Sequence, residues 1–552
     1  MEHAQALVRR LLSPAAYRHA VREVRLVETH ISWVFLTGAF AYKVKKPVDL
    51  GFLDFSTRAL RERCCHEEVR LNRRFAPELY LGVVPIVGPS ATALVGAEGE
   101  RPPDAVEWAV RMRQFDEASR LDRLLDAGGL DAEDCGALAV ELARVHGRLE
   151  TASFDAPFGT PVAVAEAIDS TIAQLRLHQP SSRERIDALA ARLRGLLAAR
   201  EQAIRRRLIA GRVRQCHGDL HLANLVRHEG RYLAFDALEF SETLRWIDVA
   251  SDVAFLAMDL RSRGRADLAA VLTSGWIEEA DDHDATSVLP VYLAYRAVVR
   301  AAVAAIRAAQ VAREEGTRRE AAEAAAREAD RYVALAERLV ADGRPVMVAT
   351  SGVSGSGKTT LAGRVAASLD AVRLRSDVER KRSAGLAATD RPQDAGEEAR
   401  LYSEESSRRT YRRLADLARQ ILHAGTSVVI DAATNHRWER RLLAEAAREA
   451  GVPLVWLAID VPETVAVDRV ARRQAEGGDA SDAGVDVVRR QFRTREPLEP
   501  AECVPGAEGR PGERIVRVAA GDLEDAAHID RLVEELREGF PPRTRAGSGA
   551  PA

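Results

Sequence analysis

The chain has 552 residues, of which 46% are hydrophobic and 30% are charged. This length exceeds what one hydrophobic core supports and predicts at least two globular domains. A formal net charge of −3 excludes a general electrostatic attraction to nucleic acid or to an anionic membrane. The five cysteines form no Cys-x-x-Cys pair, and the first ten residues hold no apolar signal segment. We therefore expect a cytoplasmic protein that has no membrane partner.

The N-terminal part of the chain, to about residue 112, is predicted to be a small lobe of mixed strands and helix. Two short strands are expected within Trp33–Val48, and a charged helix follows within Ser56–Arg74. Two further strands are predicted at Tyr80–Ile86 and Val106–Met112.

Residues 113–340 are predicted to form a helical lobe, which completes a first domain spanning residues 1–340. Apolar residues recur three and four apart in Leu138–Leu149 and Ile186–Leu208, a spacing typical of helices. Only Val213–Phe240 returns to short strands and loops. The Ala/Arg/Glu-rich run Ala301–Ala336 predicts a solvated pair of amphipathic helices, because it lacks the sustained heptads of a coiled coil.

A breaker at Asp342–Pro345 precedes a second domain, predicted at residues 345–540, and a Pro/Gly/Ser/Ala-rich tail at residues 541–552 is predicted to be disordered. Strands and helices alternate in this domain, which favours a parallel sheet with helices on both faces. The expected elements are Val346–Thr350, Thr359–Ala367, Val372–Leu374, Tyr402–Ala424, Ser427–Ile430, Glu439–Ala450 and Pro453–Ile459.

A phosphate-binding motif opens the second domain. Gly352–Thr359 has the pattern G-x-x-x-x-G-K-[ST] between an apolar strand and a helix, the context typical of an ATP-binding P-loop. In such a loop Lys358 reaches the β- and γ-phosphates and Thr359 holds Mg²⁺. Asp431 ends a buried strand and suits coordination of the same metal ion. The predicted nucleotide-binding residues are Gly352, Val353, Ser354, Gly355, Ser356, Gly357, Lys358, Thr359 and Thr360.

Two further features suggest the rest of the second site. Asp377 follows the second predicted strand, where its carboxylate could orient or deprotonate an acceptor hydroxyl; the alternative is a helix N-cap at Ser376 or Asp377. Arg469 and Arg473 precede a Gly/Asp-rich stretch, Gly477–Gly484, a pattern typical of a mobile lid that carries arginines to the phosphoryl group. A solvated basic helix face is the rival interpretation.

A different motif lies in the first domain. His217-Gly218-Asp219-Leu220-His221 is followed by Asn224 and then by Asp236. In kinases the residues of such a set have separate roles in phosphoryl transfer. Asp219 would accept the proton of the acceptor hydroxyl, Asn224 would bind Mg²⁺, and Asp236 would bridge the metal and the ATP phosphates.

This loop, with its following aspartate, resembles the aminoglycoside phosphotransferase family over about residues 25–335. The resemblance implies that Lys43 contacts the ATP phosphates and that Glu68 is its ion-pair partner. Lys45 shares the strand face of Lys43 and remains an alternative to it, as Glu67 remains an alternative to Glu68. Asp248 and Asp252 match a family feature that we expect to be structural.

The second domain has a resemblance of its own. Its segments GVSGSGKTT, RSDVERKR, VVIDA and DRVARR are similar to small P-loop kinases of the gluconate kinase and zeta-toxin-like group, over Val346–Gly521. The resemblance implies ATP-dependent phosphorylation of a small-molecule hydroxyl. Only five of the 80 basic residues are lysines, and they lie near the two predicted nucleotide sites, where a slim point charge serves better than a broad guanidinium. These lysines are Lys43, Lys45, Lys46, Lys358 and Lys381.

The predicted fold is thus an α+β bilobal protein-kinase-like domain followed by an α/β P-loop domain. The fused arrangement resembles bacterial bifunctional aminoglycoside phosphotransferase/ATP-binding proteins, and implies ATP and Mg²⁺ as cofactors and small-molecule hydroxyl acceptors as partners. One alternative is an ATP-binding regulatory protein with little transferase activity. Another is a nucleic-acid end kinase, for which the basic stretch Arg489–Arg495 has too few aromatic residues for base stacking. The acceptors and the oligomeric state are left open.

Overall fold

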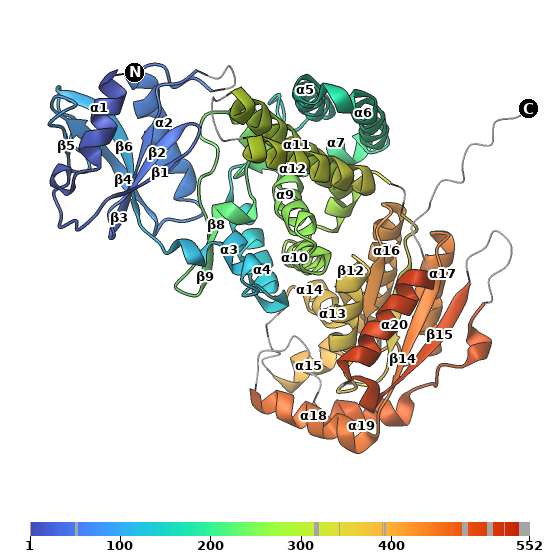
Figure 1. Cartoon of the computed structure of the whole chain (residues 1–552). Coiled ribbons are helices and arrows are strands. Elements are labelled where there is room, and N and C mark those ends of the chain that lie inside the picture. Colours follow the sequence, from blue (N-terminus) through green and yellow to red (C-terminus); the bar gives the residue numbers. More distant parts are fainter. Residues whose placement is uncertain are drawn as a thin grey trace, which may run out of the picture. The chain divides into compact units, whose positions relative to one another are not determined.

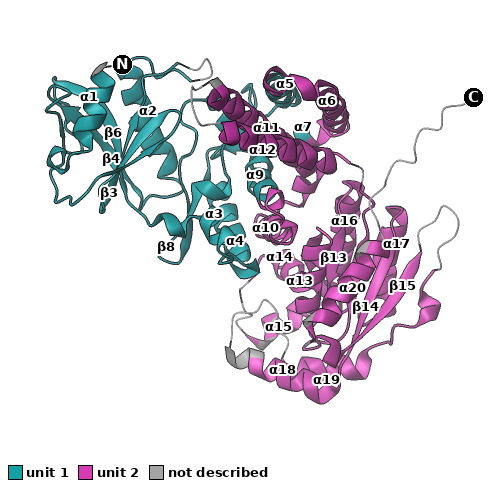
Figure 2. Cartoon of the chain, viewed as in Figure 1, with its two compact units in different colours: residues 1–173, 204–259 teal, residues 174–203, 260–552 magenta. Residues whose placement is uncertain are grey.

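The computed structural model describes residues 2–49, 53–313, 319–341, 343–388, 390, 394–476, 484–504, 512–523 and 525–539. The predicted disordered tail at 541–552 lies outside these ranges. The chain divides into two compact units, residues 1–173 with 204–259 and residues 174–203 with 260–552 (Figure 2). This division groups much of the helical lobe with the P-loop domain, so the predicted domain boundary near residue 342 stays a prediction.

The first unit contains the predicted mixed lobe, built on a six-stranded antiparallel sheet of order β1-β2-β3-β6-β4-β5 (Figure 1). Its elements are α1 (Glu2–Leu11), β1 (Arg25–Glu28), β2 (Ser32–Leu36), β3 (Phe40–Lys45), α2 (Arg58–Asn72), β4 (Tyr80–Val87), β5 (Leu94–Val95) and β6 (Ala105–Arg113). The predicted strands and the predicted helix are confirmed. The sequence prediction missed α1, β1 and β5.

Strand β3 explains how this lobe places its lysines. Tyr42 and Val44 pack into the apolar cluster that also contains residues of α1. Because side chains alternate along a strand, Lys43 and Lys45 face the opposite side of the sheet. There Val110 of β6, the cross-strand partner of Lys43, packs with α2. The two lysines are therefore directed toward the helix that carries Glu68.

The rest of the first unit contains two short antiparallel strand pairs. Strands β7 (Val213–Gln215) and β10 (Trp246–Asp248) pair antiparallel, as do β8 (Leu225–His228) and β9 (Arg231–Ala234). The motif of residues 217–224 lies between β7 and β8, and Asp236 follows β9. The remaining elements that lie in or enter this unit are η1 (Pro14–Ala16), η2 (Glu117–Ser119), α3 (Leu121–Asp126), α4 (Ala132–Arg148), α5 (Pro161–His178), α7 (Glu201–Ile209), η4 (Leu222–Asn224), α8 (Glu242–Arg245) and α9 (Val249–Ser262).

The second unit contains a five-stranded parallel sheet of order β12-β13-β11-β14-β15, which confirms the predicted sheet type. Its strands are β11 (Met347–Ser351), β12 (Val372–Arg375), β13 (Val428–Asp431), β14 (Leu454–Asp460) and β15 (Glu513–Ala519). The helices of this domain, several of which flank the sheet in Figure 1, are α13 (Lys358–Ser368), α14 (Ser376–Ser383), α15 (Ala395–Leu401), α16 (Glu404–His423), α17 (Arg437–Glu449), α18 (Glu463–Glu476), α19 (Val485–Thr494) and α20 (Ala526–Gly539). All seven predicted elements are confirmed within a few residues.

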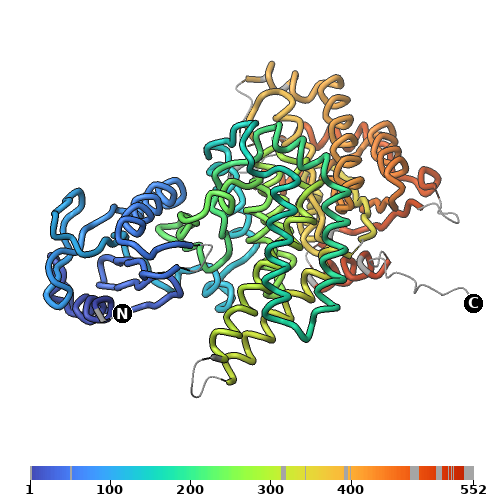
Figure 3. The backbone as a smooth tube through the Cα atoms, turned by 90° about the horizontal axis from the view of Figure 1, so that it is seen from above, coloured from blue at the N-terminus to red at the C-terminus, as the bar shows by residue number. Residues whose placement is uncertain are grey.

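The second unit also holds helices of the helical lobe. They are α6 (Arg183–Ala198), η3 (Pro180–Ser182), α10 (Ala266–Glu279), η5 (His283–Ser287), α11 (Leu289–Arg313) and α12 (Arg319–Leu339). Figure 3 shows α11 and α12 side by side, which confirms the predicted helix pair. Within the predicted run the α11 helix is amphipathic, as expected: Val303, Arg307 and Gln310 are exposed, whereas the alanines at 301, 302, 304 and 305 are buried. Residues 289–312 of α11 are long and apolar enough to cross a membrane, yet most of them are buried, as in a core helix.

Candidate active sites

The loop of residues 217–224 is held in place by two buried carboxylates, and one of them, Asp259, accepts a hydrogen bond from the backbone N–H of Leu222 at 3.0 Å. Asp252 Oδ2 accepts a hydrogen bond from the backbone N–H of His217 at 2.9 Å, and its Oδ1 accepts one from Gly218 at 3.0 Å. Burial disfavours the charged carboxylate, but the hydrogen bond from His146 and the nearby imidazoles lower the pKa of Asp252 overall. Gly218 has φ +86°, and a Cβ there would lie 2.7 Å from the carbonyl oxygen of Leu244. The loop therefore requires glycine at this position.

Within this loop Asp219 and Asn224 are direct neighbours. Asn224 Nδ2 donates to Asp219 Oδ2 at 3.1 Å and to the Asp219 carbonyl oxygen at 3.0 Å. His221 Nε2 lies 3.4 Å from Asp219 Oδ2. The Asp219 side chain is 34% exposed, so its carboxylate is accessible to a substrate hydroxyl.

Asp236 joins this loop to the sheet of the same unit. It has φ +66°, and its backbone N–H donates to the Tyr80 hydroxyl at 2.9 Å. Its carboxylate accepts a hydrogen bond from Lys43 Nζ. Since its side chain is nearly half exposed whereas that of Lys43 is buried, Asp236 offers one carboxylate to both the lysine and the open site.

Glu68 lies fully buried between the two lysines of β3. Its Oε1 accepts from Lys43 Nζ at 2.9 Å and its Oε2 from Lys45 Nζ at 2.7 Å. Burial would raise the pKa of Glu68, but the two lysines lower it to about 2. Lys45 also pairs with Glu239, which is buried as well. Two ammonium groups are thus enclosed by the carboxylates of Glu68, Asp236 and Glu239.

The geometry bears on the alternatives that the sequence left open. Glu67 pairs with Arg70 and Arg245 rather than with either lysine, so the ion pair belongs to Glu68. Both lysines contact Glu68, but only Lys43 also contacts Asp236. Which lysine contacts the ATP phosphates remains a prediction. The additional contact between Lys43 and Asp236 favours Lys43.

Asp248 and Asp252, expected to be structural, do anchor the loop region. Both Asp248 oxygens accept hydrogen bonds from the buried Arg207 guanidinium, at 2.7 and 2.8 Å.

Sequence reasoning missed several residues of this site. Glu239 follows Asp236 by only three positions, but an isolated glutamate gives no sign of its distant lysine. Asn72 links two parts of the site, since its side chain accepts a hydrogen bond from the backbone N–H of Ala237 at 2.9 Å and donates one to the Glu68 carbonyl oxygen at 2.9 Å. No motif signalled Asn72 or Tyr80.

The second site forms around residues 352–360, which join β11 to α13. Gly355 has φ +79°, and a Cβ there would overlap the carbonyl oxygen of Ala466; Gly357 has φ +93°, and its Cβ would lie 2.7 Å from Leu523 Cδ1. Gly357 is also the N-cap residue of α13. These close approaches explain the glycines and leave backbone N–H groups at a helix N-terminus, a typical phosphate-binding arrangement.

Lys358, Thr359 and Asp431 converge at the end of this loop. Lys358 Nζ donates to the carbonyl oxygen of Val353 at 2.6 Å, and Thr359 Oγ1 donates to Asp431 Oδ1 at 3.4 Å. Burial raises the pKa of Asp431, although Arg373 and Lys358 act in the opposite direction. Ser356 Oγ is buried and has no hydrogen-bond partner within the described part of the chain.

A cavity of about 1020 Å³ brings the predicted residues of the second site together. Its lining includes Lys358, Thr359, Asp377, Asp431 and Arg469. The alternative of a helix cap is wrong: α14 begins at Ser376 with Arg375 as its N-cap residue, and Asp377 is its second residue. Arg473 also lies in α18, but its side chain is outside the described residues, as are residues 477–483 of the predicted lid.

The chain resembles proteins of Mycobacterium along most of its length.

 It is 31% identical over 459 residues to the uncharacterized protein Rv2004c of Mycobacterium tuberculosis and to the uncharacterized protein Mb2027c of Mycobacterium bovis, matches that cover 82% of this chain and 87% of each relative. The chain belongs to the same family as these proteins.

Two family models divide the chain in the way the motifs predicted. Residues 52–289 match the phosphotransferase enzyme family, and residues 347–498 match an AAA domain. The chain therefore joins a phosphotransferase-family domain to a P-loop domain, and the two predicted resemblances are confirmed. The chain is a kinase-type phosphotransferase.

Two solved structures are similar to part of the chain. A choline/ethanolamine kinase family protein from Mesorhizobium loti is 13% identical, with a TM-score of 0.34, and the match covers 61% of this chain and 100% of that one. A gluconokinase from Sinorhizobium meliloti is 21% identical, with a TM-score of 0.22, and the match covers 35% of this chain and 97% of that one.

ATP and Mg²⁺ are the cofactors of this family member, and the residues present fit them. In the second site the glycine loop and the cavity suit a triphosphate, and Thr359 and Asp431 offer the hydroxyl and carboxylate oxygens that Mg²⁺ prefers. In the first site the amide of Asn224 and the carboxylate of Asp236 are a comparable oxygen set, and Lys43 adds a positive charge beside it.

Proposed function

We propose that this chain is a two-site phosphotransferase, in which each half transfers the γ-phosphoryl group of ATP to a hydroxyl group of a small molecule. The proposal rests on the observation that each half holds two carboxylates with different contacts. Asp236 contacts Lys43 and Asp431 contacts Thr359, which suits phosphate and metal binding. A second carboxylate, Asp219 or Asp377, is left to face an acceptor.

In the first site Asp219 would act as the base. Its exposed carboxylate accepts a hydrogen bond from Asn224 Nδ2, which fixes its orientation. A substrate hydroxyl that donates to Asp219 would lose its proton to this carboxylate as the oxygen attacks the phosphoryl group. Lys43 would bind the phosphates, with its ammonium group held by Glu68.

In the second site Asp377 would have the same role. It lines the same cavity as Lys358, and its side chain makes no hydrogen bond or ion pair with other residues in the described ranges. Arg469, on α18, reaches the cavity from the side of the P-loop and would stabilise charge on the transferred group. When bound, Mg²⁺ neutralises charge on the β- and γ-phosphates.

A small molecule is a better acceptor than a nucleic-acid end for this cavity. Phe492 is the one aromatic side chain in the basic stretch 489–495, and it packs against the apolar core of the unit and under the Arg495 guanidinium. Arg495 also lies 3.8 Å from Asp460. Phe492 therefore offers no free stacking surface, and the Arg495 charge is partly compensated, whereas proteins that bind single-stranded nucleic acid combine exposed aromatic side chains with a positively charged groove.

Replacing each proposed base tests the function and separates it from ATP-dependent regulation. Asp219→Asn and Asp377→Asn should each reduce labelled phosphoryl transfer at their own site by about 100-fold or more, whereas binding of a fluorescent ATP analogue persists. The exposed carboxylates Asp104 and Asp416 supply the controls Asp104→Asn and Asp416→Asn. If both base variants transfer phosphate at the wild-type rate, the proposal is wrong; if wild type binds ATP and transfers nothing, the regulatory alternative is favoured.

A further inference from the structure

Helix α14, which carries Asp377, presents different residues on two faces. Asp377 and Arg380, three residues apart, both line the cavity of the second site. Glu379 and Arg382, also three residues apart, share another face of the helix, and Arg375, the N-cap residue at the end of β12, directly precedes it. That second face contacts helical-lobe residues that belong to the same compact unit.

Glu278, near the end of α10, holds Arg375 in place at the start of α14. Arg375 Nε donates to Glu278 Oε2 at 2.7 Å, and Arg375 Nη2 contacts the other oxygen of the same carboxylate. This two-point contact fixes the guanidinium plane as well as its position. Arg382 donates to the backbone carbonyl oxygen of Glu278. Because Arg375 also lines the cavity, Glu278 controls a cationic side chain two residues before Asp377.

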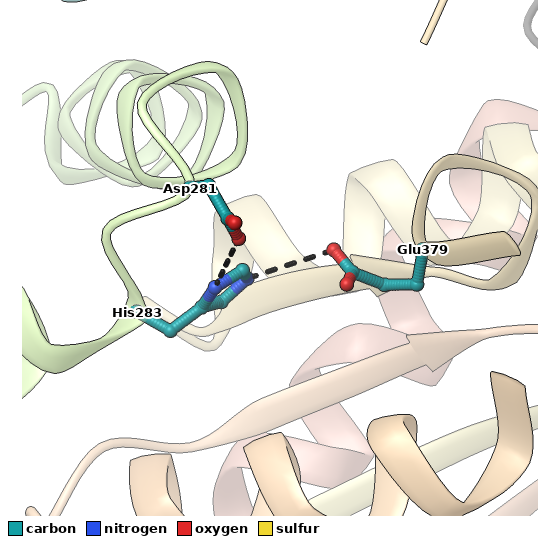
Figure 4. Close-up of side chains that lie close together, drawn as sticks. All are labelled: Asp281, His283 and Glu379. Atoms are coloured by element: carbon teal, nitrogen blue, oxygen red, sulfur yellow. Dashed lines mark ion pairs between the residues drawn. The ribbon is translucent and has the colours of Figure 1, made fainter. Parts of the chain in front are cut away.

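A cluster of Asp281, His283 and Glu379 forms the second contact (Figure 4). His283 Nδ1 lies 3.5 Å from Asp281 Oδ1, and its Nε2 lies 3.9 Å from Glu379 Oε1. The His283 and Glu379 side chains are almost fully buried. The imidazole therefore bridges the helical lobe and α14.

Arginines supply the positive charge of this cluster. Arg413 Nη2 lies 3.0 Å from Asp281 Oδ1, and Arg413 Nε contacts Glu379. Arg382 contacts the same two carboxylates. The hydrogen bond from His283, together with these arginines, lowers the pKa of Asp281 despite its partial burial. The three ligand types would suit a metal ion, but two arginines already neutralise both carboxylates, so we interpret the cluster as an ion-pair network.

We propose that Glu278 and Asp281 are positioning residues for the second site: these helical-lobe carboxylates hold α14 so that Asp377 faces the acceptor. This inference rests on the proposed role of Asp377. The network contacts Arg375 at the end of β12 and Glu379 in α14, the helix that carries Asp377, and its side chains include none of the phosphate-binding residues 352–360. Loss of either carboxylate should therefore impair phosphoryl transfer more than ATP binding.

The test is a double-mutant cycle in the full chain, carrying Asp219→Ala to silence the first site. Transfer of labelled γ-phosphate from ATP into a desalted mixture of small metabolites is measured for Glu278→Gln, Asp281→Asn, Asp377→Asn and the two combinations with Asp377→Asn. The exposed neighbour variant Glu279→Gln is the matched control. Binding of a fluorescent ATP analogue is measured for each protein.

Positioning predicts that Glu278→Gln and Asp281→Asn each slow transfer by about 10- to 100-fold and leave ATP affinity within a factor of about two, with Glu279→Gln unchanged. It also predicts that neither variant slows transfer further once Asp377 is replaced, because the group being positioned is absent. The inference would be overturned if the double variants transferred more slowly than Asp377→Asn alone, or if Glu278→Gln or Asp281→Asn also lost ATP binding. If Asp377→Asn itself transfers at the wild-type rate, the proposed function of the site fails instead.

Discussion

Glu68 Oε1 accepts a hydrogen bond from Lys43 Nζ at 2.9 Å, and the same carboxylate also binds Lys45. The local charges are two ammonium groups and three carboxylates, since Asp236 and Glu239 complete the set. The excess negative charge lies on the side of Asp236, the carboxylate that is open to the site. This balance suits a divalent cation better than an isolated lysine–glutamate pair does.

Breaking this arrangement at Glu68 should destabilise the first unit. Glu68→Gln leaves a buried ammonium without part of its counter-charge, a loss of about 3 kcal/mol in the free energy of unfolding. Hydrogen exchange of α2 and β3 in the full chain measures that loss locally. The control is Glu67→Gln, which removes a more exposed ion pair and should cost less than about 1 kcal/mol. Equal protection in both variants would contradict the central position of Glu68.

The same carboxylate predicts a pH dependence. The pKa of Glu68 is lowered from 4.5 to about 2 in the folded chain. A lowered folded-state pKa contributes stability that is fully present above pH 4.5 and is lost as the pH falls toward about 2. We therefore expect the stability difference between wild type and Glu68→Gln to shrink over this range. A difference that stays constant from pH 5 to about pH 2.5 would be inconsistent with that pKa.

Asp252 should affect transfer at the first site without touching the substrate. Each carboxylate oxygen of Asp252 accepts a hydrogen bond from one backbone N–H group, that of His217 or that of Gly218. In Asp252→Asn an NH₂ donor takes the place of one of these oxygens, which should displace the two residues. We expect transfer by the first site to fall by about 100-fold, while the second site is unchanged. Asp267→Asn, at a partly exposed ion pair with Arg265, is the control. An unchanged rate for Asp252→Asn would show that the loop holds its geometry by other contacts.

Lysine should be required at position 358 even when its charge is kept. Lys358 is one of five lysines among 80 basic residues, and its ammonium reaches back to the Val353 carbonyl oxygen inside the glycine loop. A guanidinium is broader and does not fit such a loop. Lys358→Arg should slow transfer at the second site by about 100-fold or more, whereas the reverse exchange Arg364→Lys on the exposed face of α13 should be neutral. Full activity of Lys358→Arg would remove this explanation of the lysine.

Close backbone approach at Gly355 should be essential for nucleotide binding. Gly355 and Gly425 have similar backbone angles, φ +79° and +87°, but only at Gly355 does an added Cβ meet another atom, the Ala466 carbonyl oxygen. Gly425→Ala should cost only the left-handed strain of about 1–2 kcal/mol. Gly355→Ala should also lose ATP binding at the second site, measured by titration with a non-hydrolysable ATP analogue. Equal effects of the two variants would argue against the steric explanation.

The sequence predicted the parts of each site that local patterns encode. Alternation along one strand placed Lys43 and Lys45 on one face, and the glycine spacing placed the loop before Lys358. Partners brought together by tertiary folding were not predictable: Glu239 lies 194 residues from Lys45, and no local pattern joins them. The N-cap residue of α14 is Arg375, one residue before the first position that we considered, so Asp377 does not cap the helix. Residue spacing alone does not predict a helix start to within one residue.

The same contrast applies to the fold. The strongly apolar strands β11, β13 and β14 were predicted because they are buried on both faces. The edge strand β15 was missed, since only one of its seven residues is fully buried. The helix pair of Ala301–Ala336 was predictable because its charged residues recur with helical spacing on one face. The burial of the rest of α11 was not predictable, since it depends on neighbouring helices.

The most direct test of two active sites is the set of products formed from labelled ATP and Mg²⁺ in a desalted mixture of small metabolites, compared among wild type, Asp219→Ala and Lys358→Ala. Two active sites predict two groups of labelled products, one lost in Asp219→Ala and the other in Lys358→Ala. A single group of products that disappears in only one variant, or an identical product pattern in all three proteins, would contradict a two-site phosphotransferase.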